Sequence, residues 1–574
     1  MARATLHDRA TWWLRHLLHG VLLAVALLFT SVRPATAQTP VPGGTLGDTT
    51  WTAAGSPYIV SGGLTVAAGA TLTVEPGVTV QFDGYWLTVD GTLIAVGTAA
   101  APIVIKGLSD TPGYWDGITI EGDSGNINTG SRLAYVTLSD GKPNLTLFYA
   151  HVTVANSVIS NSSSDGIYGE QAGVADVSAT SFTGNQGYGL SFDDGSVDPA
   201  LASITMSGNG TNAIRLGGGT IAASRTWKNV GVPYQIEGGF TVAAGATLTV
   251  EPGVTVQFDG HWLTVDGTLM AVGTAAAPIV FKGLSDTPGY WDGISIQGDP
   301  GNINTGSRLE YVTVSDGRPN LDLYFARVTV ANSVISNSGS DGIHGQLGGV
   351  ADVSATRFTG NQGYGLSFDD GSVDPALASI AMIGSGTNAI RFAGGTIGAS
   401  RTWKNLGLPY RITGGLVVAA GATLTVEAGV TVQFDGSWLT VDGTLMAVGT
   451  AAAPIVFKGL SDTPGYWDGI TIEGDSGNIN TGSRLEYVTV SDGKPNLDLY
   501  FARVTVANSV ISNSSSDGIH GQLGGIADVS ATRFTGNQGY GLSFDDGSVD
   551  PALASIVMSG SGTNAIRLGG GTIG

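Results

Sequence analysis

The chain has 574 residues, of which 89 are glycine and none is cysteine, and only 12% are charged. The absence of cysteine excludes disulfide frameworks, thiolate nucleophiles and cysteine-ligated metals. The net charge of −21 repels phosphate backbones and anionic membranes, so we expect no nucleic-acid partner. Glycine at about twice its usual frequency, together with 42% hydrophobic residues, predicts a folded protein with many tight turns.

Residues 1–37 are predicted to be an export signal. They combine a basic start, an apolar stretch at 21–29 and a small-residue cleavage site at 35–37. The apolar stretch is shorter than the roughly 20 residues that span a bilayer, and no later segment approaches that length. We therefore expect a secreted or cell-surface protein, with the periplasm as the alternative, and no transmembrane segment after the signal is removed. Residues 38–50, rich in Pro, Gly and Thr, are predicted to be a spacer.

From Trp51 onward the sequence repeats with a period of 176 residues. The segment TLTVEPGVTVQFDG begins at Thr71 and again at Thr247, and TLTVEAGVTVQFDG begins at Thr423. This period divides the chain into module 1 (51–226), module 2 (227–402) and module 3 (403–574).

Each module contains a shorter repeat of about 24 residues. Asn161, Asn185 and Asn209 are spaced by 24, and short segments of alternating apolar and small polar residues precede them. Such a unit predicts an all-β, right-handed parallel β-helix solenoid with about seven rungs per module. Stacked asparagines at this spacing are predicted to form an internal amide ladder from rung to rung, which Ser385 and Ser561 interrupt at the positions of Asn209.

The runs VTVANSVISNSSSDGIYG and SATSFTGNQGYGLSF resemble the rungs of right-handed parallel β-helix proteins of the pectate-lyase-like superfamily. The segments LTVEPGVTVQFDG and YWDGITIEG are similar to those of exported bacterial β-helix repeat proteins. The resemblance covers residues 51–574. It implies the fold but not one function, because this fold carries polysaccharide lyases, glycosidases, adhesins and structural stalks.

An acidic loop, FDDGSVDP in module 1, recurs in each module. Clustered carboxylates on a turn can bind an oxygen-ligated cation, so one interpretation is a weak Ca²⁺ site, and the other is a turn with solvated aspartates. No cofactor is required by either interpretation. The candidate calcium ligands are Asp193, Asp194, Asp198, Asp369, Asp370, Asp374, Asp545, Asp546 and Asp550.

The turn DTPGYWDGI places a Tyr-Trp pair in each module. Adjacent residues of an extended segment point to opposite faces, so one ring packs and the other is available to a ligand such as a sugar. The candidate ligand-binding residues are Tyr114, Trp115, Tyr290, Trp291, Tyr466 and Trp467. A second tryptophan series, Trp86, Trp262 and Trp438, is predicted to pack within strands.

The function predicted from these features is an exported, non-catalytic rod, adhesive or structural, that binds a polysaccharide or extracellular-matrix surface at repeated sites and self-associates end to end. We predict no catalytic residues for this reading. The alternative is a polysaccharide lyase or glycoside hydrolase, for which the best candidates are Asp369, Asp370 and His344. Against it, the order of these residues departs from the polygalacturonase pattern, and the arginine signature of pectate lyases is missing.

Overall fold

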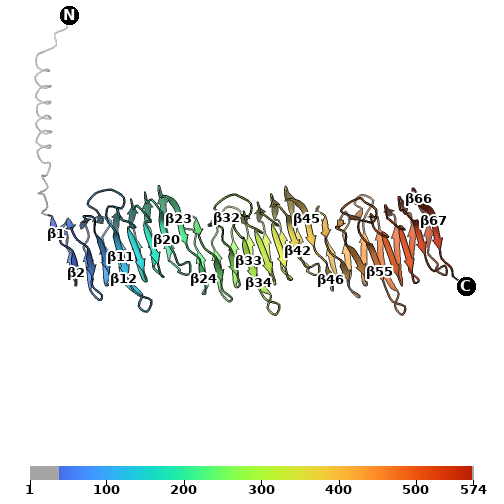
Figure 1. The fold of residues 1–574 in the computed structure, drawn as a ribbon, viewed down its shortest axis with the longest axis horizontal. Coiled ribbons are helices and arrows are strands. Elements are labelled where there is room, and N and C mark those ends of the chain that lie inside the picture. The colour runs from blue at the N-terminus through green and yellow to red at the C-terminus, as the bar shows by residue number, and fades with distance from the viewer. Residues whose placement is uncertain (1–37, 572–574) are drawn as a thin grey trace, which may run out of the picture.

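A computed structural model describes residues 38–571, and in it the chain is a long parallel β-solenoid with three strands in each turn (Figure 1). The predicted all-β parallel β-helix is therefore confirmed. Within this described part the 67 strands are interrupted by a single 3₁₀ turn, at Ala53–Gly55, and no helix is long and apolar enough to cross a membrane. The predicted export signal lies outside the described residues.

The strands of the first module form three parallel sheets, one on each side of the solenoid. The first sheet contains β1 (Thr39–Val41), β4 (Tyr58–Val60), β7 (Thr79–Phe82), β10 (Ile103–Gly107), β13 (Val136–Ser139), β16 (Val158–Ser160), β19 (Ser181–Thr183) and β22 (Thr205–Ser207). The second contains β2 (Gly44–Leu46), β5 (Leu64–Val66), β8 (Trp86–Val89), β11 (Gly117–Glu121), β14 (Leu145–Phe148), β17 (Ile167–Glu170), β20 (Tyr188–Phe192) and β23 (Thr211–Leu216). The third contains β3 (Thr49–Trp51), β6 (Thr71–Val74), β9 (Thr92–Val96), β12 (Asn128–Ala134), β15 (Ala150–Ala155), β18 (Val174–Ser178) and β21 (Leu201–Ala202).

Residues 38–50 are not a spacer. They contribute β1, β2 and the start of β3, which pair in parallel with β4, β5 and β6. These strands are the first turn of the solenoid, and the prediction failed because three-residue strands leave too few residues to show an alternating pattern.

The core is a single apolar column inside the three sheets. In β6, Leu72 and Val74 are buried while Thr71 and Thr73 face outward, and most strands repeat this alternation. Side chains along a strand point to opposite faces, so every second residue of each strand enters the column. The interior is closed by apolar packing and by hydrogen bonds between consecutive turns.

The modules do not contain a whole number of turns. The strand that begins module 1, β4, corresponds to β26 (Tyr234–Ile236) and β48 (Tyr410–Ile412), so each module contributes 22 strands. Because three strands make one turn, a module spans about seven and a third turns instead of the seven predicted. At the boundary, β23 of the second sheet pairs with β26, which is the module 2 equivalent of a first-sheet strand. The two other sheets end there, and β24 (Gly219–Ile221) and β25 (Arg225–Trp227) begin new ones.

The twist of the sheets compensates for this extra third of a turn. One third of a turn spread over about seven turns is about 16° per strand, which lies within the usual twist between neighbouring strands. In Figure 1, strands β2, β11, β20, β23 and β32 (Ile279–Gly283) of one 15-stranded sheet climb from the lower to the upper edge of the rod. Loops beside β12, β34 (Asn304–Glu310) and β55 (Gly469–Glu473) consequently project from the same side. Equivalent surfaces of the three modules thus face one way, about 35 Å apart along the axis.

An internal amide ladder is present, with one of its predicted members replaced. Asn185 and Asn209 are buried, and the Asn185 Nδ2 donates to Asn209 Oδ1 over 2.8 Å, while Asn209 Nδ2 donates to the carbonyl of Phe182 over 3.1 Å. Asn161 instead occupies a left-handed bend with φ of 55° and donates to Asp140 Oδ1. The third buried amide is Asn144, whose Nδ2 donates to Asn185 Oδ1 over 3.3 Å.

We expect Ser385→Asn to raise the free energy of unfolding by about 1 kcal/mol. The Ser385 hydroxyl is buried without a hydrogen-bond partner among residues 38–571. Its backbone N–H is bonded to Asn388 as that of Asn209 is to Asn212, so an asparagine fits the same position and can extend the ladder. Urea titration of the single variant measures the gain. The reverse change, Asn209→Ser, is the matched control and should lose a similar amount; a pair of variants that both leave stability unchanged would contradict the ladder's contribution.

Candidate functional site

The acidic loop of module 1 separates its carboxylates instead of gathering them. Asp193 Oδ1 pairs with Arg215 Nη1 at 2.6 Å, and its other oxygen accepts the hydroxyl of Tyr168. Asp194 Oδ1 accepts the backbone N–H of Ser196 within its own turn, at 2.8 Å. Within residues 38–571 no three His, Asp or Glu side chains are grouped so as to hold a metal ion. The geometry therefore gives no support to the predicted calcium sites at Asp193, Asp194 and Asp198, nor to those at Asp369, Asp370, Asp374, Asp545, Asp546 and Asp550.

The same loop instead joins two modules. Arg225, in the first strand of a new sheet, directs its guanidinium at the carbonyls of Gly195, Ser196 and Val197, at 3.2, 2.7 and 2.7 Å. Arg401 repeats these bonds at the second boundary, to the carbonyls of 371–373. Arg225 and Arg401 are the second-last residues of modules 1 and 2, and their strands pair with strands of the next module, β25 with β28 (Thr247–Val250) and β47 (Arg401–Trp403) with β50 (Thr423–Val426). Through this pairing the arginine connects the loop to the next module where two of the three sheets are interrupted.

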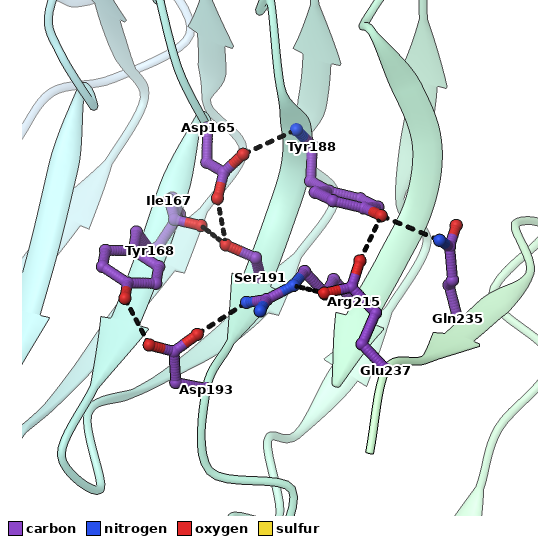
Figure 2. Close-up of polar contacts among 9 residues, drawn as sticks. All are labelled: Asp165, Ile167, Tyr168, Tyr188, Ser191, Asp193, Arg215, Gln235 and Glu237. Atoms are coloured by element: carbon purple, nitrogen blue, oxygen red, sulfur yellow. Dashed lines mark hydrogen bonds and ion pairs between the residues drawn. The ribbon is translucent and has the colours of Figure 1, made fainter. Parts of the chain in front are cut away.

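Figure 2 shows a polar network at the boundary between modules 1 and 2. Arg215 bridges Asp193 and Glu237, with Nη1 and Nε each 2.6 Å from a carboxylate oxygen. The Tyr188 hydroxyl donates to Glu237 over 2.6 Å and accepts from Gln235 over 2.8 Å. Burial, followed by the bond to Glu237, raises the pKa of Tyr188 well above its ordinary value. Every cationic group in this network is matched by a carboxylate, so it is a structural connection across the boundary.

His344 and Asp369, proposed as part of a catalytic group, do lie together. His344 Nε2 is 3.2 Å from Asp369 Oδ2, and Arg391 Nη1 is 2.9 Å from Asp369 Oδ1. Burial alone would raise the pKa of Asp369, but the bonds from Arg391 and His344 outweigh it and hold that pKa below its usual value. Asp370 does not join them, because its Oδ1 accepts the N–H of Ser372 within the turn at 2.7 Å. A glycosidase needs two carboxyl groups facing one cleft, and Asp370, bonded within its own turn, does not supply the second one beside Asp369.

The Tyr-Trp turns place the tryptophan inside and the tyrosine outside. Trp115 is 1% exposed, stacks on Phe82 with ring centroids 4.2 Å apart and donates from Nε1 to the carbonyl of Ser139 at 2.7 Å. A ring buried in this way cannot stack on a sugar, so the ligand-binding prediction is wrong for Trp115, Trp291 and Trp467. The half-buried Tyr114 donates its hydroxyl to Asp83 over 2.8 Å, and that bond raises the pKa of Tyr114. Tyr114, Tyr290 and Tyr466 stay candidates.

The exposed aromatic residue of each module is the tryptophan that was expected to pack. Trp86, Trp262 and Trp438 are each 45% exposed. The Trp86 indole covers the backbone of Gly63, where an added Cβ would lie 2.5 Å from the ring, so the glycine makes room for it. The prediction failed because Trp86 takes an outward position at the edge of its strand, one residue before the inward Leu87.

These residues form what we call the aromatic patch. In module 1 it consists of Asp83, Tyr85, Trp86 and Tyr114, with the Tyr85 and Trp86 ring centroids 6.3 Å apart. The equivalent patches are Asp259, His261, Trp262 and Tyr290 in module 2, and Asp435, Ser437, Trp438 and Tyr466 in module 3. The patch combines an exposed ring face with a carboxylate and a phenol hydroxyl. A sugar can stack its apolar face on the ring and hydrogen-bond its hydroxyl groups to the polar groups. The signal that could have located the patch is the glycine 23 residues upstream of each tryptophan, Gly63, Gly239 and Gly415.

A second feature is a shallow polar depression beside the loop between β11 and β12. It has a volume of about 490 Å³ and is lined in part by Asp90, Glu121 and Asp123. Burial and the nearby Asp90 raise the pKa of Glu121. Module 2 has an equivalent depression, but Gln297 replaces the glutamate there. The depression of module 1 thus pairs two carboxylates, and that of module 2 has an amide in place of one of them. The sequence did not reveal either depression.

Comparison with known proteins matches three segments of the chain to one family model, described as "Pectate-lyase like beta helix domain". The matched residues are 44–142, 219–317 and 395–494, which together make up about half of the chain. A segment of 89 residues, 15% of the chain, is 39% identical to "Protein bark beetle" of Drosophila melanogaster, but it spans only 3% of that protein. The three family matches follow the 176-residue period and each begins near a module boundary.

Proposed function

The chain belongs to the family of pectate-lyase-like β-helix domains. We propose that it is an exported, non-catalytic rod that binds a carbohydrate polymer through its three aromatic patches. The observation that carries this proposal is the exposure of Trp86, Trp262 and Trp438 at equivalent places. Tryptophan and tyrosine side chains are enriched at interaction surfaces, because each combines a large apolar ring with a hydrogen-bonding group. A cell-surface polysaccharide or extracellular matrix is the partner we propose.

The arrangement of the patches supports binding to a repetitive polymer. The modules present equivalent surfaces on one side of the rod, about 35 Å apart. A single patch offers one exposed indole, so each contact is weak. When three weak contacts engage one chain, the second and third become intramolecular, and the overall affinity can exceed that of one patch by roughly 10²–10⁴-fold.

We expect the triple variant Trp86→Ala, Trp262→Ala and Trp438→Ala to lose binding to polysaccharide by roughly 10²-fold or more, because it loses both stacking and avidity. Retention on a panel of immobilised neutral and acidic polysaccharides measures the change. The single variants should each weaken binding only several-fold.

The matched control is the double variant Leu347→Ala and Leu523→Ala. It removes one exposed apolar side chain from module 2 and one from module 3, away from the patches and the depressions, and should leave binding unchanged. Equal binding by the tryptophan variant and the native chain would refute the proposal that the aromatic patches bind the polysaccharide. Release of oligosaccharide products that is abolished by Glu121→Gln with Glu473→Gln would overturn the non-catalytic proposal and assign the paired-carboxylate depressions instead.

A further inference from the structure

Two arginines stand side by side on the outer face at the boundary between modules 2 and 3. Arg391 lies in β45 (Thr387–Phe392) and Arg411 in β48, and the parallel register pairs them directly. Like charges on neighbouring strands repel and destabilise a sheet when nothing lies between them. In a chain with a net charge of −21, such a pair is a local exception.

The first boundary has the same backbone but a different set of charges. There Arg215 is held by two carboxylates, Asp193 and Glu237, and its neighbour on the next strand is the neutral Gln235 (Figure 2). At the second boundary Arg411 replaces Gln235 and Thr413 replaces Glu237. One cation has been gained and one anion lost, so the local charge is two units more positive.

The surrounding residues do not fully satisfy these guanidinium groups. Arg391 keeps Asp369, and its Nε donates to Thr413 Oγ1 over 3.2 Å. The nearest carboxylate oxygen to Arg411 belongs to Asp435, 3.9 Å from Nη2 and thus beyond hydrogen-bond distance. The Arg411 Nε is buried with no hydrogen-bond partner among the described residues, although the side chain is 14% exposed. A buried donor left unpaired costs about 1–3 kcal/mol.

An aromatic ring fixes both groups in place. The Tyr364 ring centroid is 6.0 Å from the Arg391 guanidinium carbon and 5.7 Å from that of Arg411. Cation–π contacts of this length hold the two planar groups against a common surface. The equivalent Tyr188 hydroxyl donates to Glu237 at the first boundary, and Thr413 stands in place of that acceptor at the second.

We propose that Arg391 and Arg411, which we call the guanidinium pair, bind one oxyanion between them, a carboxylate or a sulfate group. An oxyanion would accept hydrogen bonds from both planar guanidinium groups and remove their mutual repulsion. At the first boundary the Glu237 carboxylate accepts a hydrogen bond from Arg215 and balances its charge. At the second boundary, where Thr413 replaces that glutamate, the bound oxyanion takes the place of the carboxylate. This site borders the module 3 aromatic patch, because Asp435 of that patch is the carboxylate nearest to Arg411. The proposal does not use the patch tryptophans and does not depend on their function.

The test exchanges the residues of the two boundaries. The double variant Arg411→Gln and Thr413→Glu gives the second boundary the residues of the first, where the same backbone accommodates them. Sodium sulfate and sodium glucuronate are titrated into the native chain and the variant by calorimetry, at an ionic strength held constant with sodium chloride. We expect the native chain to bind one equivalent, and the variant to bind at least about 10-fold more weakly.

The reverse exchange, Gln235→Arg with Glu237→Thr, should create a second site and raise the stoichiometry to two. Preference for sulfate identifies a sulfate ester, and preference for glucuronate identifies a carboxylate; both support the proposal. Failure of the native chain to bind either anion, or equal binding by the native chain and the Arg411→Gln, Thr413→Glu variant, would overturn it. The triple tryptophan variant should retain anion binding, so failure of the two proposals can be told apart.

Discussion

Replacing Arg401 with methionine is expected to lower the free energy of unfolding by about 3 kcal/mol and to split one unfolding transition into two. The Arg401 guanidinium is buried and donates to the carbonyls of Gly371, Ser372 and Val373, so its loss leaves those acceptors unpaired at the boundary. Hydrogen bonds to charged groups contribute about 1.5–3 kcal/mol, and unpaired buried groups add a cost.

The splitting follows from the architecture of a solenoid. Each turn contacts its neighbours only, so stability is approximately a sum of local terms and interface terms. At this boundary only one of the three sheets is continuous, and weakening the loop contact allows module 3 to unfold before modules 1 and 2. Urea unfolding monitored by tryptophan fluorescence and by scanning calorimetry measures both effects.

Arg484→Met provides the control for this prediction. Its side chain is 50% exposed and pairs only with Glu486 among the described residues, so stability should change by less than about 0.5 kcal/mol. Arg225→Met should behave like Arg401→Met at the first boundary. A single unaltered transition in Arg401→Met would show that the loop does not couple the modules.

Trp291→Ala is expected to cost about 3–5 kcal/mol of stability, the range found when a large buried aromatic side chain is truncated. Trp291 is fully buried, stacks on Phe258 with ring centroids 4.2 Å apart, and donates from Nε1 to the carbonyl of Ser315 over 2.7 Å. Trp291→Phe keeps the stacking and loses the hydrogen bond, so about 1–2 kcal/mol should be lost. Chemical denaturation of the three proteins gives these differences directly.

Trp262→Ala is the comparison that distinguishes the two tryptophan series. It removes an indole that is 45% exposed, so stability should fall by about 1 kcal/mol or less while polysaccharide binding weakens. Trp291→Ala should show the opposite result in conditions where it stays folded. If Trp291→Ala were as stable as the native chain and lost binding, the assignment of the buried and exposed roles would be reversed.

Much of the fold could be predicted from the residues alone. Alternating segments such as Thr71–Val74 and a repeat near 24 residues predict stacked parallel strands, because burial of every second side chain is a local property. The amide ladder at Asn185 and Asn209 follows from the same spacing. Short edge strands such as β1 were missed, since three residues carry too little pattern to be separated from a loop.

The candidate sites could be predicted less well from the sequence than the fold. Trp86 and Trp115 face opposite ways for different reasons. Trp86 is the first residue of β8, where a shift of one position along the strand exchanges the two faces, whereas Trp115 lies in the turn before β11, so the turn sets its direction. The acidic loop has the composition of a cation site, but its carboxylates have different partners: Asp193 pairs with Arg215 of the next turn, and Asp194 accepts the N–H of Ser196 within the loop. Paired groups from distant residues, such as Asp90 with Glu121, are joined only by the stacking of turns.

The sequence by itself determined most of the strands, their inward side chains, the 176-residue period and the recurrence of most surface features in the three modules. The tertiary structure decided how those repeats are oriented. A module of 22 strands leaves an extra third of a turn, and only the accumulated twist of the sheets brings equivalent surfaces back to one side. Strand pattern depends on which side chains alternate along a few residues, whereas twist is a small rotation per strand that becomes decisive only when summed over the whole module.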